Sequence, residues 1–200
     1  MSGNEAAPRQ HMPRAMARLL IPDAGPLFSL AAGNLLHLLL KFRLGLTDVV
    51  CTETVHRGLA PNASIEARNL LAFYNAHAQH IETFATQVGA AIAKLRAQDP
   101  HYPTPPNLGE LSIQSLLIDL QLQSPKTRPV ILFEDTWFLR NAVALPKTCV
   151  LLSTQAFLEY AAEKAWIASA AQARQQIARA RPTAWAASVQ IAPAEPKPRR

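Results

Sequence analysis

Apolar and polar residues follow one another in blocks that predict strands and helices in turn. Short, mostly apolar runs predict buried strands at 18–22, 42–46, 80–84, 130–133 and 148–152. Apolar residues at helical spacing between these runs predict helices over 27–41 (with a break at Gly33-Asn34), 49–59, 61–76, 87–97, 108–122 and 136–143. Such alternation favours parallel strands joined by right-handed crossovers. We therefore predict an α/β fold of three layers, α/β/α, around a short central parallel sheet.

The two ends of the chain differ from this pattern. Residues 1–17 are polar and aperiodic, and residues 182–200 contain four prolines and a basic end, so both predict disordered tails around one domain at 18–181. Thr154 opens an Ala-rich segment that predicts an extra long C-terminal helix to about Arg181. This helix could cover the sheet or pair with a second copy of the chain in a homodimer.

Composition narrows the class of protein. A hydrophobic fraction of 49% in 200 residues is enough for a buried core, and a net charge of +6 weakly favours an anionic partner. The two cysteines lack metal or disulfide spacing, which predicts a reducing, cytoplasmic setting. Asp23 and two prolines interrupt a stretch that otherwise imitates an export signal, and no apolar run is long enough for a membrane-spanning helix. We expect no membrane association.

Four acidic residues fall at predicted junctions between elements. Asp23 ends the first strand, Glu53 lies one turn into the helix after the second, Glu110 begins a helix after a proline-rich loop, and Asp135 follows the strand VILF, with Glu134 beside it. Each alone has a structural explanation, because Asp often caps helices and an acid in the first turn complements the helix dipole.

Taken together, the four acids predict a different role. The carboxyl ends of parallel strands meet at one edge of a sheet, where the loops open. Carboxylates gathered there repel one another unless a cation neutralises them, and Mg²⁺ or Mn²⁺ is the cation that such hard oxygen ligands suit. The sequence therefore predicts an acidic metal site in an α/β domain.

Four segments resemble a PIN domain, the ribonuclease fold shared by many bacterial toxins of toxin–antitoxin pairs. LLIPDAGPLFSLAAGNLLHLL resembles its opening strand and acidic turn, TDVVCTE its V-x-x-E helix, and LGELSI the Gly-Glu helix start of one subgroup. VILFEDTWFLRNA, followed by a strand and STQAFLEYA, resembles the acidic strand end and closing unit. The resemblance extends from about Arg18 to Glu163.

The resemblance implies an endoribonuclease in which carboxylates hold Mg²⁺ or Mn²⁺ and hydrolyse RNA phosphodiester bonds. The catalytic and metal-binding roles would then belong to Asp23, Glu53, Glu110 and Asp135. Glu134 is either a fifth participant or an exposed neighbour. Ser29 and Thr154 either help to order the site or cap helices, and capping is the preferred interpretation for both. The resemblance also implies RNA as substrate and an antitoxin protein as partner. Two further groups could contact RNA, although exposed charge and helix packing are the preferred interpretations of them. The possible phosphate contacts are His56, Arg57, Arg68, Arg128 and Arg140, and Trp137 could stack on a base.

The sequence departs from the toxin pattern at several points. Residues 61–106 form a longer segment than in compact toxins, Glu110 stands where many relatives carry Asp, and Thr136 replaces an Arg that often follows the last acid. The alternative is therefore a catalytically weak or inactive PIN-like module that binds nucleic acid or a protein. A phosphoacceptor receiver is disfavoured because Lys147 precedes the last predicted strand. No common nucleotide-binding loop or nucleophile elbow occurs.

Overall fold

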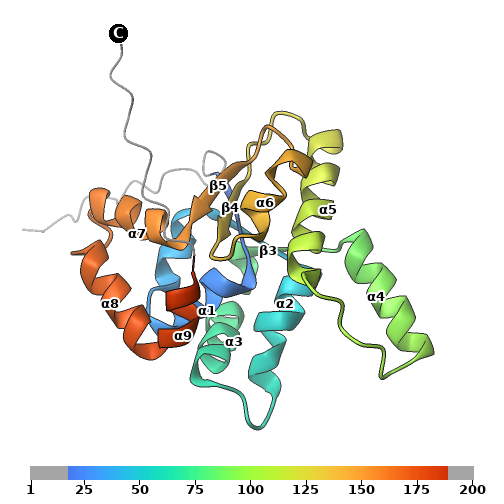
Figure 1. Ribbon diagram of the computed structural model, residues 1–200, viewed down its shortest axis with the longest axis horizontal. Helices are drawn as coiled ribbons and strands as arrows, with labels where there is room; N and C mark the ends of the chain where they lie inside the picture. Colours follow the sequence, from blue (N-terminus) through green and yellow to red (C-terminus); the bar gives the residue numbers. More distant parts are fainter. Residues whose placement is uncertain (1–17, 189–200) are drawn as a thin grey trace, which may run out of the picture.

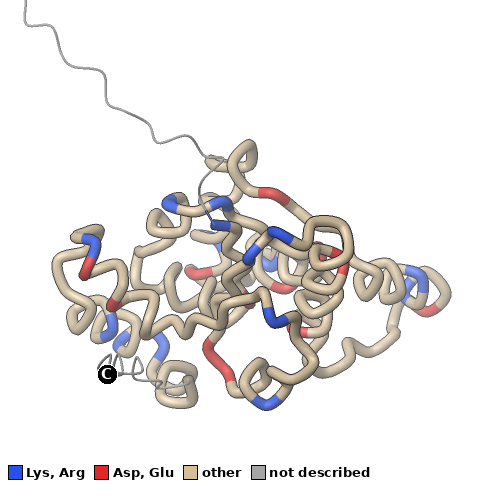
Figure 2. Tube along the Cα trace, turned by 90° about the horizontal axis from the view of Figure 1, so that it is seen from above, with Lys and Arg blue, Asp and Glu red and all other residues tan. Residues whose placement is uncertain are grey.

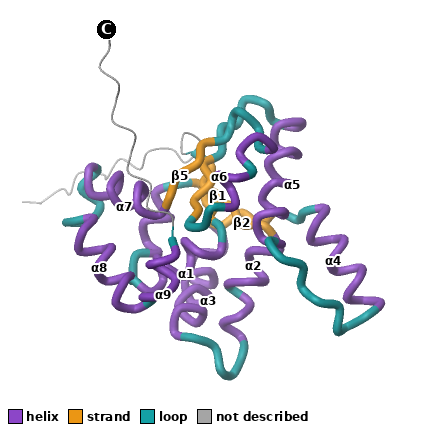
Figure 3. Tube along the Cα trace, viewed as in Figure 1, coloured by secondary structure: helices purple, strands orange, loops and turns teal. Residues whose placement is uncertain are grey.

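The computed structural model describes residues 18–188 and contains a five-stranded sheet in the order β3-β2-β1-β4-β5. Figure 1 shows the sheet at the centre of the molecule, and Figure 3 shows helices on both of its sides. The strands are β1 (Leu19–Pro22), β2 (Arg43–Thr47), β3 (Ile81–Phe84), β4 (Val130–Phe133) and β5 (Val150–Ser153). All adjacent pairs are parallel, which confirms the predicted three-layer α/β/α fold with a short central parallel sheet.

β1 lies in the middle of the sheet and sets the position of the candidate site. It pairs with β2 on one side and with β4 on the other, where Ile21 is opposite Ile131. Leu20 and Ile21 are fully buried because helices cover both faces of the sheet. The carboxyl ends of β1 and β4, after Pro22 and Phe133, are therefore neighbours at the same edge.

The helices complete two outer layers. The α-helices are α1 (Ala24–Ala32), α2 (Asp48–Thr54), α3 (Ile65–His77), α4 (Gln87–Gln98), α5 (Leu108–Gln123), α6 (Trp137–Arg140), α7 (Thr154–Glu163), α8 (Ala170–Ala180) and α9 (Pro182–Ala187). Short 3₁₀ helices are η2 (Leu36–Lys41), η3 (His56–Leu59), η4 (Ala78–His80) and η5 (Ala142–Ala144). α1 contacts α3 and α8, and α8 contacts α7, whereas α5 contacts α2 and α4.

Most of these boundaries follow from local sequence signals. Thr47 and Ser64 cap α2 and α3, each accepting a backbone N–H with its hydroxyl oxygen. The predicted break after the first helix is present, with Asn34 at a φ of 55°. The first helix was predicted to begin at residue 27, but α1 begins three residues earlier, at Ala24.

The long helix expected from Thr154 to about Arg181 is instead two helices, α7 and α8. α7 ends in a Schellman motif, in which the Trp166 N–H donates to the Ala161 carbonyl and Ala165 has a φ of 54°. Glycine usually fills this left-handed position, so the alanine-rich sequence carried no stop signal. The Trp166 ring, directly after the break, packs edge-on against Phe42, with centroids 5.9 Å apart. Phe42 is distant from the break in sequence, so no local pattern indicates this contact.

The tail predicted at 182–200 begins later than expected. Residues 182–187 form α9, which starts with Pro182 at a position where the missing N–H costs no hydrogen bond. Trp185 of this helix is 8% exposed and belongs to the main core. The tail expected at 1–17 and the rest of the C-terminal one lie outside the described residues.

Two apolar clusters hold the described part of the chain together. The main core joins the sheet to α1, α3, α5, α7 and α8. A smaller cluster formed by Val49, Ile92 and Leu108 attaches α4 to α2 and α5. Cys51 and Cys149 are both free thiols. Within residues 18–188, every helix is too short or too polar to cross a bilayer.

A candidate metal centre at the carboxyl edge of the sheet

Three carboxylates from separate parts of the sequence meet at the edge formed by β1 and β4. Asp23 follows β1, Asp135 lies two residues after β4, and Glu110 is in the first turn of α5. One oxygen from each of the three side chains lies within 4.8 Å of the others. These oxygens are close enough to share one cation, as the sequence predicted for this edge.

Asp23 is the buried member of this acidic triad. Its backbone N–H donates to the Leu132 carbonyl at 2.9 Å, which continues the pairing between β1 and β4. The residue is 6% exposed, and its side chain makes no capping hydrogen bond to α1 although it occupies the N-cap position. Burial, and then repulsion from Asp135, Glu53 and Glu134, raises the pKa of Asp23 to about 7, although the Ala24 N–H partly offsets this.

Glu110 follows a glycine that lies against two other acids of the site. A Cβ atom at position 109 would lie 2.8 Å from Glu53 Oε2 and 3.4 Å from Asp23 Oδ1, so a side chain there would require the end of Glu53 to move. Burial is the largest cause that raises the pKa of Glu110 to about 8, followed by the charge of Asp23. In the LGE sequence, Gly109 thus packs against Glu53 and Asp23, and Glu110 supplies a carboxylate to the triad.

Asp135 is exposed and combines two roles. Its Oδ1 atom accepts the Trp137 N–H at 2.7 Å, which fixes the carboxylate at the start of α6. Thr136 is the N-cap residue of α6, so Asp135 does not occupy the capping position that the sequence allowed for it. The Asp135 hydrogen bond is an Asx turn two residues long, and it coexists with the position in the triad.

Glu53 borders the same cavity but is not part of the closest group of oxygens. It lies on α2 and is half-buried, and burial raises its pKa while Arg57 and Arg96 act in the opposite direction. The structure therefore brings the four predicted acids to one place, with three in close proximity and Glu53 on the adjoining wall.

Glu134 is buried, so it is not the exposed neighbour that one interpretation allowed. Its Oε2 atom accepts a hydrogen bond from the Ser29 hydroxyl at 3.0 Å and lies 4.0 Å from Nη1 of Arg181. Arg181 also donates to Ser29 Oγ at 2.8 Å and to the Gly25 carbonyl at 3.1 Å. Burial raises the pKa of Glu134 despite these contacts. Glu134 and Arg181 thus form a compensated pair beside the triad.

The predicted capping roles of Ser29 and Thr154 are wrong. Ser29 lies within α1 and donates to Glu134, whereas Ser153 caps α7 by accepting the Ala156 N–H. The hydroxyl of Thr154 lies near enough to Glu134 to lower its pKa, although Thr154 Oγ1 and Glu134 Oε1 have no hydrogen-bond partner within 3.5 Å. Both residues therefore belong to the surroundings of Glu134.

The acids surround a cavity of about 320 Å³, which we name the acid cavity. It is lined by Asp23, Glu53, Glu110, Glu134, Asp135 and Arg181, together with small residues from β1–α1 and α9. Figure 1 shows α9 beside α1, where the C-terminal segment reaches the carboxyl edge of the sheet. Sequence reasoning missed Arg181 as a site residue because its contacts are with residues 25–29 and 134.

The acidic triad has no side-chain counter-charge in the part of the chain that the structure describes. Ion pairs within 4.0 Å involve Glu82, Glu134, Glu159 and Glu163, and none involves Asp23, Glu110 or Asp135. Basic positions are instead spread widely over the trace (Figure 2). Three carboxylates this close need protons or a cation to offset their repulsion, and the triad could bind a metal ion.

The residues proposed to contact RNA are mostly placed elsewhere. Arg57 lines a second and larger hollow, whereas Arg68 donates to the Ala63 carbonyl at 2.6 Å. The Trp137 ring packs edge-on against Phe138. Arg96 lines the same hollow as Arg57 but was not singled out, because its position depends on how α4 packs.

Comparisons with known proteins add no relative, since the chain matches no protein-family model, no curated protein and no solved structure.

Proposed function

We propose that the protein is a metal-dependent endoribonuclease with a PIN-like fold, which hydrolyses RNA phosphodiester bonds at the acid cavity. The observation that carries this proposal is the triad: three carboxylate oxygens within 4.8 Å, without an ion-pair partner among the described residues. The parallel three-layer fold and the order of the acids along the chain agree with the resemblance to PIN domains. The antitoxin, the homodimer and the cytoplasmic location remain predictions.

The donor set fits a hard divalent cation. Carboxylate oxygens are the ligands that Mg²⁺ and Mn²⁺ prefer, and the raised pKa values of Asp23 and Glu110 reflect charge that a cation would neutralise. Asp23, Glu110 and Asp135 would hold the ion, with Glu53 on the adjoining wall. A bound cation of this kind supplies acidification of a water ligand and neutralisation of phosphoryl charge.

The protein's own residues prepare the cavity for this chemistry. The Trp137 N–H holds the Asp135 carboxylate, and the absence of a side chain at Gly109 leaves room for Glu53 and Asp23. Glu53 has a raised pKa and is half-buried, so it can accept a proton from a water in the cavity as a general base. Glu134 is already engaged with Ser29 and Arg181, and we assign it a supporting role in fixing β4 against α1.

The test is cleavage of a labelled single-stranded RNA by the full chain with Mg²⁺, Mn²⁺ or EDTA. We expect cleavage with either metal, none in EDTA, and at least a hundredfold loss in Asp135→Asn and Glu110→Gln. Glu163→Gln is the matched control, because Glu163 is an exposed acid at the end of α7. Mn²⁺ binding by calorimetry should weaken in the same two variants. Intact RNA under all metal conditions would contradict the proposal, as would full activity in both triad variants.

A further inference from the structure

A groove of about 700 Å³ adjoins the acid cavity between α2 and α4. The two hollows share Ala24 and Glu53. On its other side the α2–α4 groove shares Phe28 and Arg57 with a smaller hollow of about 230 Å³ beside α3. Three hollows therefore follow one another along this side of the molecule. A succession of this kind fits an extended polymer better than a compact small molecule.

Two arginines, Arg57 and Arg96, and two acids, Asp48 and Glu53, line the groove, and no ion pair within 4.0 Å joins an arginine to an acid there. Arg57 is exposed and its guanidinium makes no hydrogen bond or ion pair with another described residue. Arg96 donates to Thr104 Oγ1 at 2.7 Å, which holds it at the groove. Both residues lie near enough to Glu53 to lower its pKa, so both stand beside the acid cavity.

Asp48, the acid of the groove that is not shared with the acid cavity, accepts hydrogen bonds from uncharged groups of the protein. Asp48 accepts hydrogen bonds from the Val49 N–H at 2.9 Å, the Thr86 hydroxyl at 2.8 Å and the Thr86 N–H at 3.2 Å. These bonds join the start of α2 to the start of α4. The side chains of Arg57 and Arg96 are therefore the groups in the groove that can receive an anion.

Apolar side chains provide the rest of the wall. Phe28 of α1 and Ile92 and Ala93 of α4 line the groove, and Ile92 belongs to the small cluster that attaches α4. Apolar surfaces beside arginines suit nucleotides whose base faces are free, as in single strands. In a duplex the base faces are stacked on one another, and the exposed surface is mainly phosphate and sugar.

We propose that the α2–α4 groove binds single-stranded RNA, with backbone phosphate on Arg57 and Arg96 and an unpaired base against its apolar wall. This inference rests on the proposed function for its substrate, since the groove adjoins the acid cavity through the shared lining residues Ala24 and Glu53. Arg57 and Arg96 then bind the nucleotides that are next to the cleaved bond. The groove thereby determines that the substrate must be unpaired there.

The test measures binding separately from cleavage. A fluorescein-labelled uridine 12-mer and a blunt RNA duplex of 12 base pairs are titrated with the full chain in EDTA, and anisotropy is recorded. We expect the single strand to bind at least tenfold more tightly than the duplex. Substituting both Arg57→Ala and Arg96→Ala should weaken binding of the single strand at least tenfold. It should also reduce the slope of log K against log salt by about 1.4, at about 0.7 for each phosphate contact.

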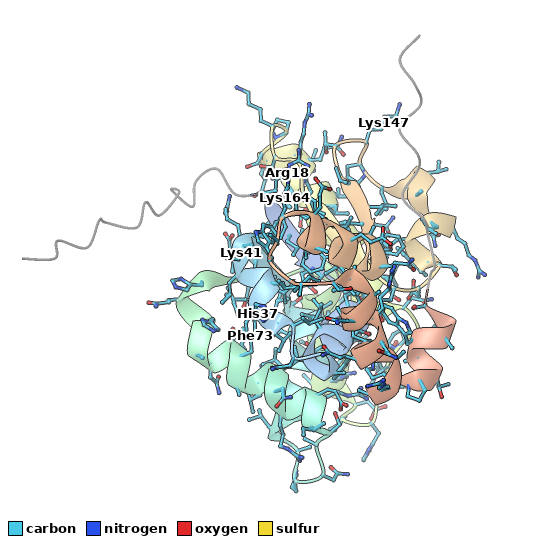
Figure 4. All side chains as sticks on the ribbon, turned by 90° about the vertical axis from the view of Figure 1, so that its left-hand side faces the viewer. Arg18, His37, Lys41, Phe73, Lys147 and Lys164 are labelled. Carbon is cyan, nitrogen blue, oxygen red and sulfur yellow. The ribbon has the colours of Figure 1, made fainter. Side chains whose placement is uncertain are left out.

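Two matched controls distinguish the groove from general charge. The double variant Lys94→Ala/Lys147→Ala also removes two positive charges, but neither lysine lines the groove. Lys94 lies two residues before Arg96, and Lys147 is in the loop before β5 (Figure 4). This pair should change affinity by less than twofold. Ala93→Glu should weaken binding at least fivefold, whereas Ala91→Glu, on another face of α4, should not. Thermal melts confirm that each variant folds.

The outcomes separate this inference from the proposed function. Wild-type affinity of the Arg57→Ala/Arg96→Ala variant for the uridine 12-mer overturns the groove, even if metal-dependent cleavage is present. Equal affinity for the duplex also overturns it, as does displacement of the 12-mer by polyglutamate at equal concentration of charge. Loss of binding in the arginine variant supports the groove even if no metal produces cleavage, in which case the proposed nuclease function fails by itself.

Discussion

The acid cavity and the α2–α4 groove share Ala24 and Glu53, yet they are built from different parts of the fold. The acid cavity lies where β1 and β4 end, and its charged residues come from the sheet edge, α2, α5 and the segment before α9. The groove is lined mainly by helices, and its arginines belong to η3 and α4. The lining of the acid cavity is dominated by acids, whereas in the groove two arginines balance two acids.

The arginines of the two hollows are held in different ways. Arg181 in the acid cavity donates to Ser29 and Gly25 and lies 4.0 Å from Glu134, so its charge is already used inside the protein. Arg57 in the groove has no such partner among the described residues. A basic residue near an acidic centre can therefore have a structural role or be available to a ligand. The contacts that its side chain makes within the protein determine which of these roles it has.

The largest expected effect is on the acid cavity, through Asp23→Asn. The amide removes a buried charge, so metal-dependent cleavage should fall at least a hundredfold, which corresponds to about 3 kcal/mol. The melting temperature without metal at pH 8 should not fall, because repulsion from the neighbouring acids is relieved. Single-turnover cleavage and thermal melts measure the two quantities. A variant that is inactive only because it unfolds would contradict this prediction.

The two kinds of arginine can be compared directly in stability. Arg181→Ala leaves the buried Glu134 without its cation, and we expect a loss of about 2 kcal/mol of the free energy of unfolding. For a chain of this size that lowers the melting temperature by about 4–8 °C. Arg57→Ala is the control and should change it by less than about 1 °C. Equal effects of the two substitutions would remove the distinction.

The acid cavity should also make stability depend on pH. The folded chain keeps a proton on Asp23 up to about pH 7, whereas the unfolded chain releases it near 3.8. The folded state therefore binds more protons between these values, and the free energy of unfolding falls as pH rises. From pH 5.5 to 8, Asp23 alone accounts for about 2 kcal/mol, or about 4–8 °C in melting temperature.

Added Mn²⁺ checks the origin of this pH dependence. Because protons and the cation compete for the same carboxylates, excess Mn²⁺ should raise the melting temperature more at pH 8 than at pH 5.5. Asp23→Asn should reduce both the pH dependence and the response to Mn²⁺. A pH dependence that persists unchanged in this variant would assign it to other groups.

The smallest effect on binding affinity is expected at the wall that both hollows share. Glu53→Gln removes one negative charge next to the triad and next to Arg57 and Arg96. Mn²⁺ affinity should fall by about threefold to tenfold, whereas affinity for single-stranded RNA in EDTA should rise by about twofold to threefold. Calorimetry and anisotropy record these opposite changes. Parallel changes in both affinities would show that Glu53 does not separate the two hollows.

Local sequence patterns were sufficient for the five strands and for the placing of the four acids at one edge of the sheet. Buried strands can be recognised because both faces of a parallel sheet are covered, as in VILF, which is β4. The strand ends then place acids at one edge without knowledge of any side-chain contact. The same reasoning could not foresee the left-handed Ala165 or the packing of Trp166 on Phe42, and so it joined α7 and α8 into one helix.

The alternation of strands and helices follows from periodicity and chain order, and so does the gathering of Asp23, Glu110 and Asp135 at one edge of the sheet. Three other features emerge only when the chain is folded: Glu134 is buried, Ser29 and Arg181 contact it, and Arg57 and Arg96 lie near Glu53. These features depend on contacts between residues distant in the chain, which no local pattern specifies. Burial and opposite charge engage Glu134 and Arg181 with each other, whereas Arg57 stays available to a ligand.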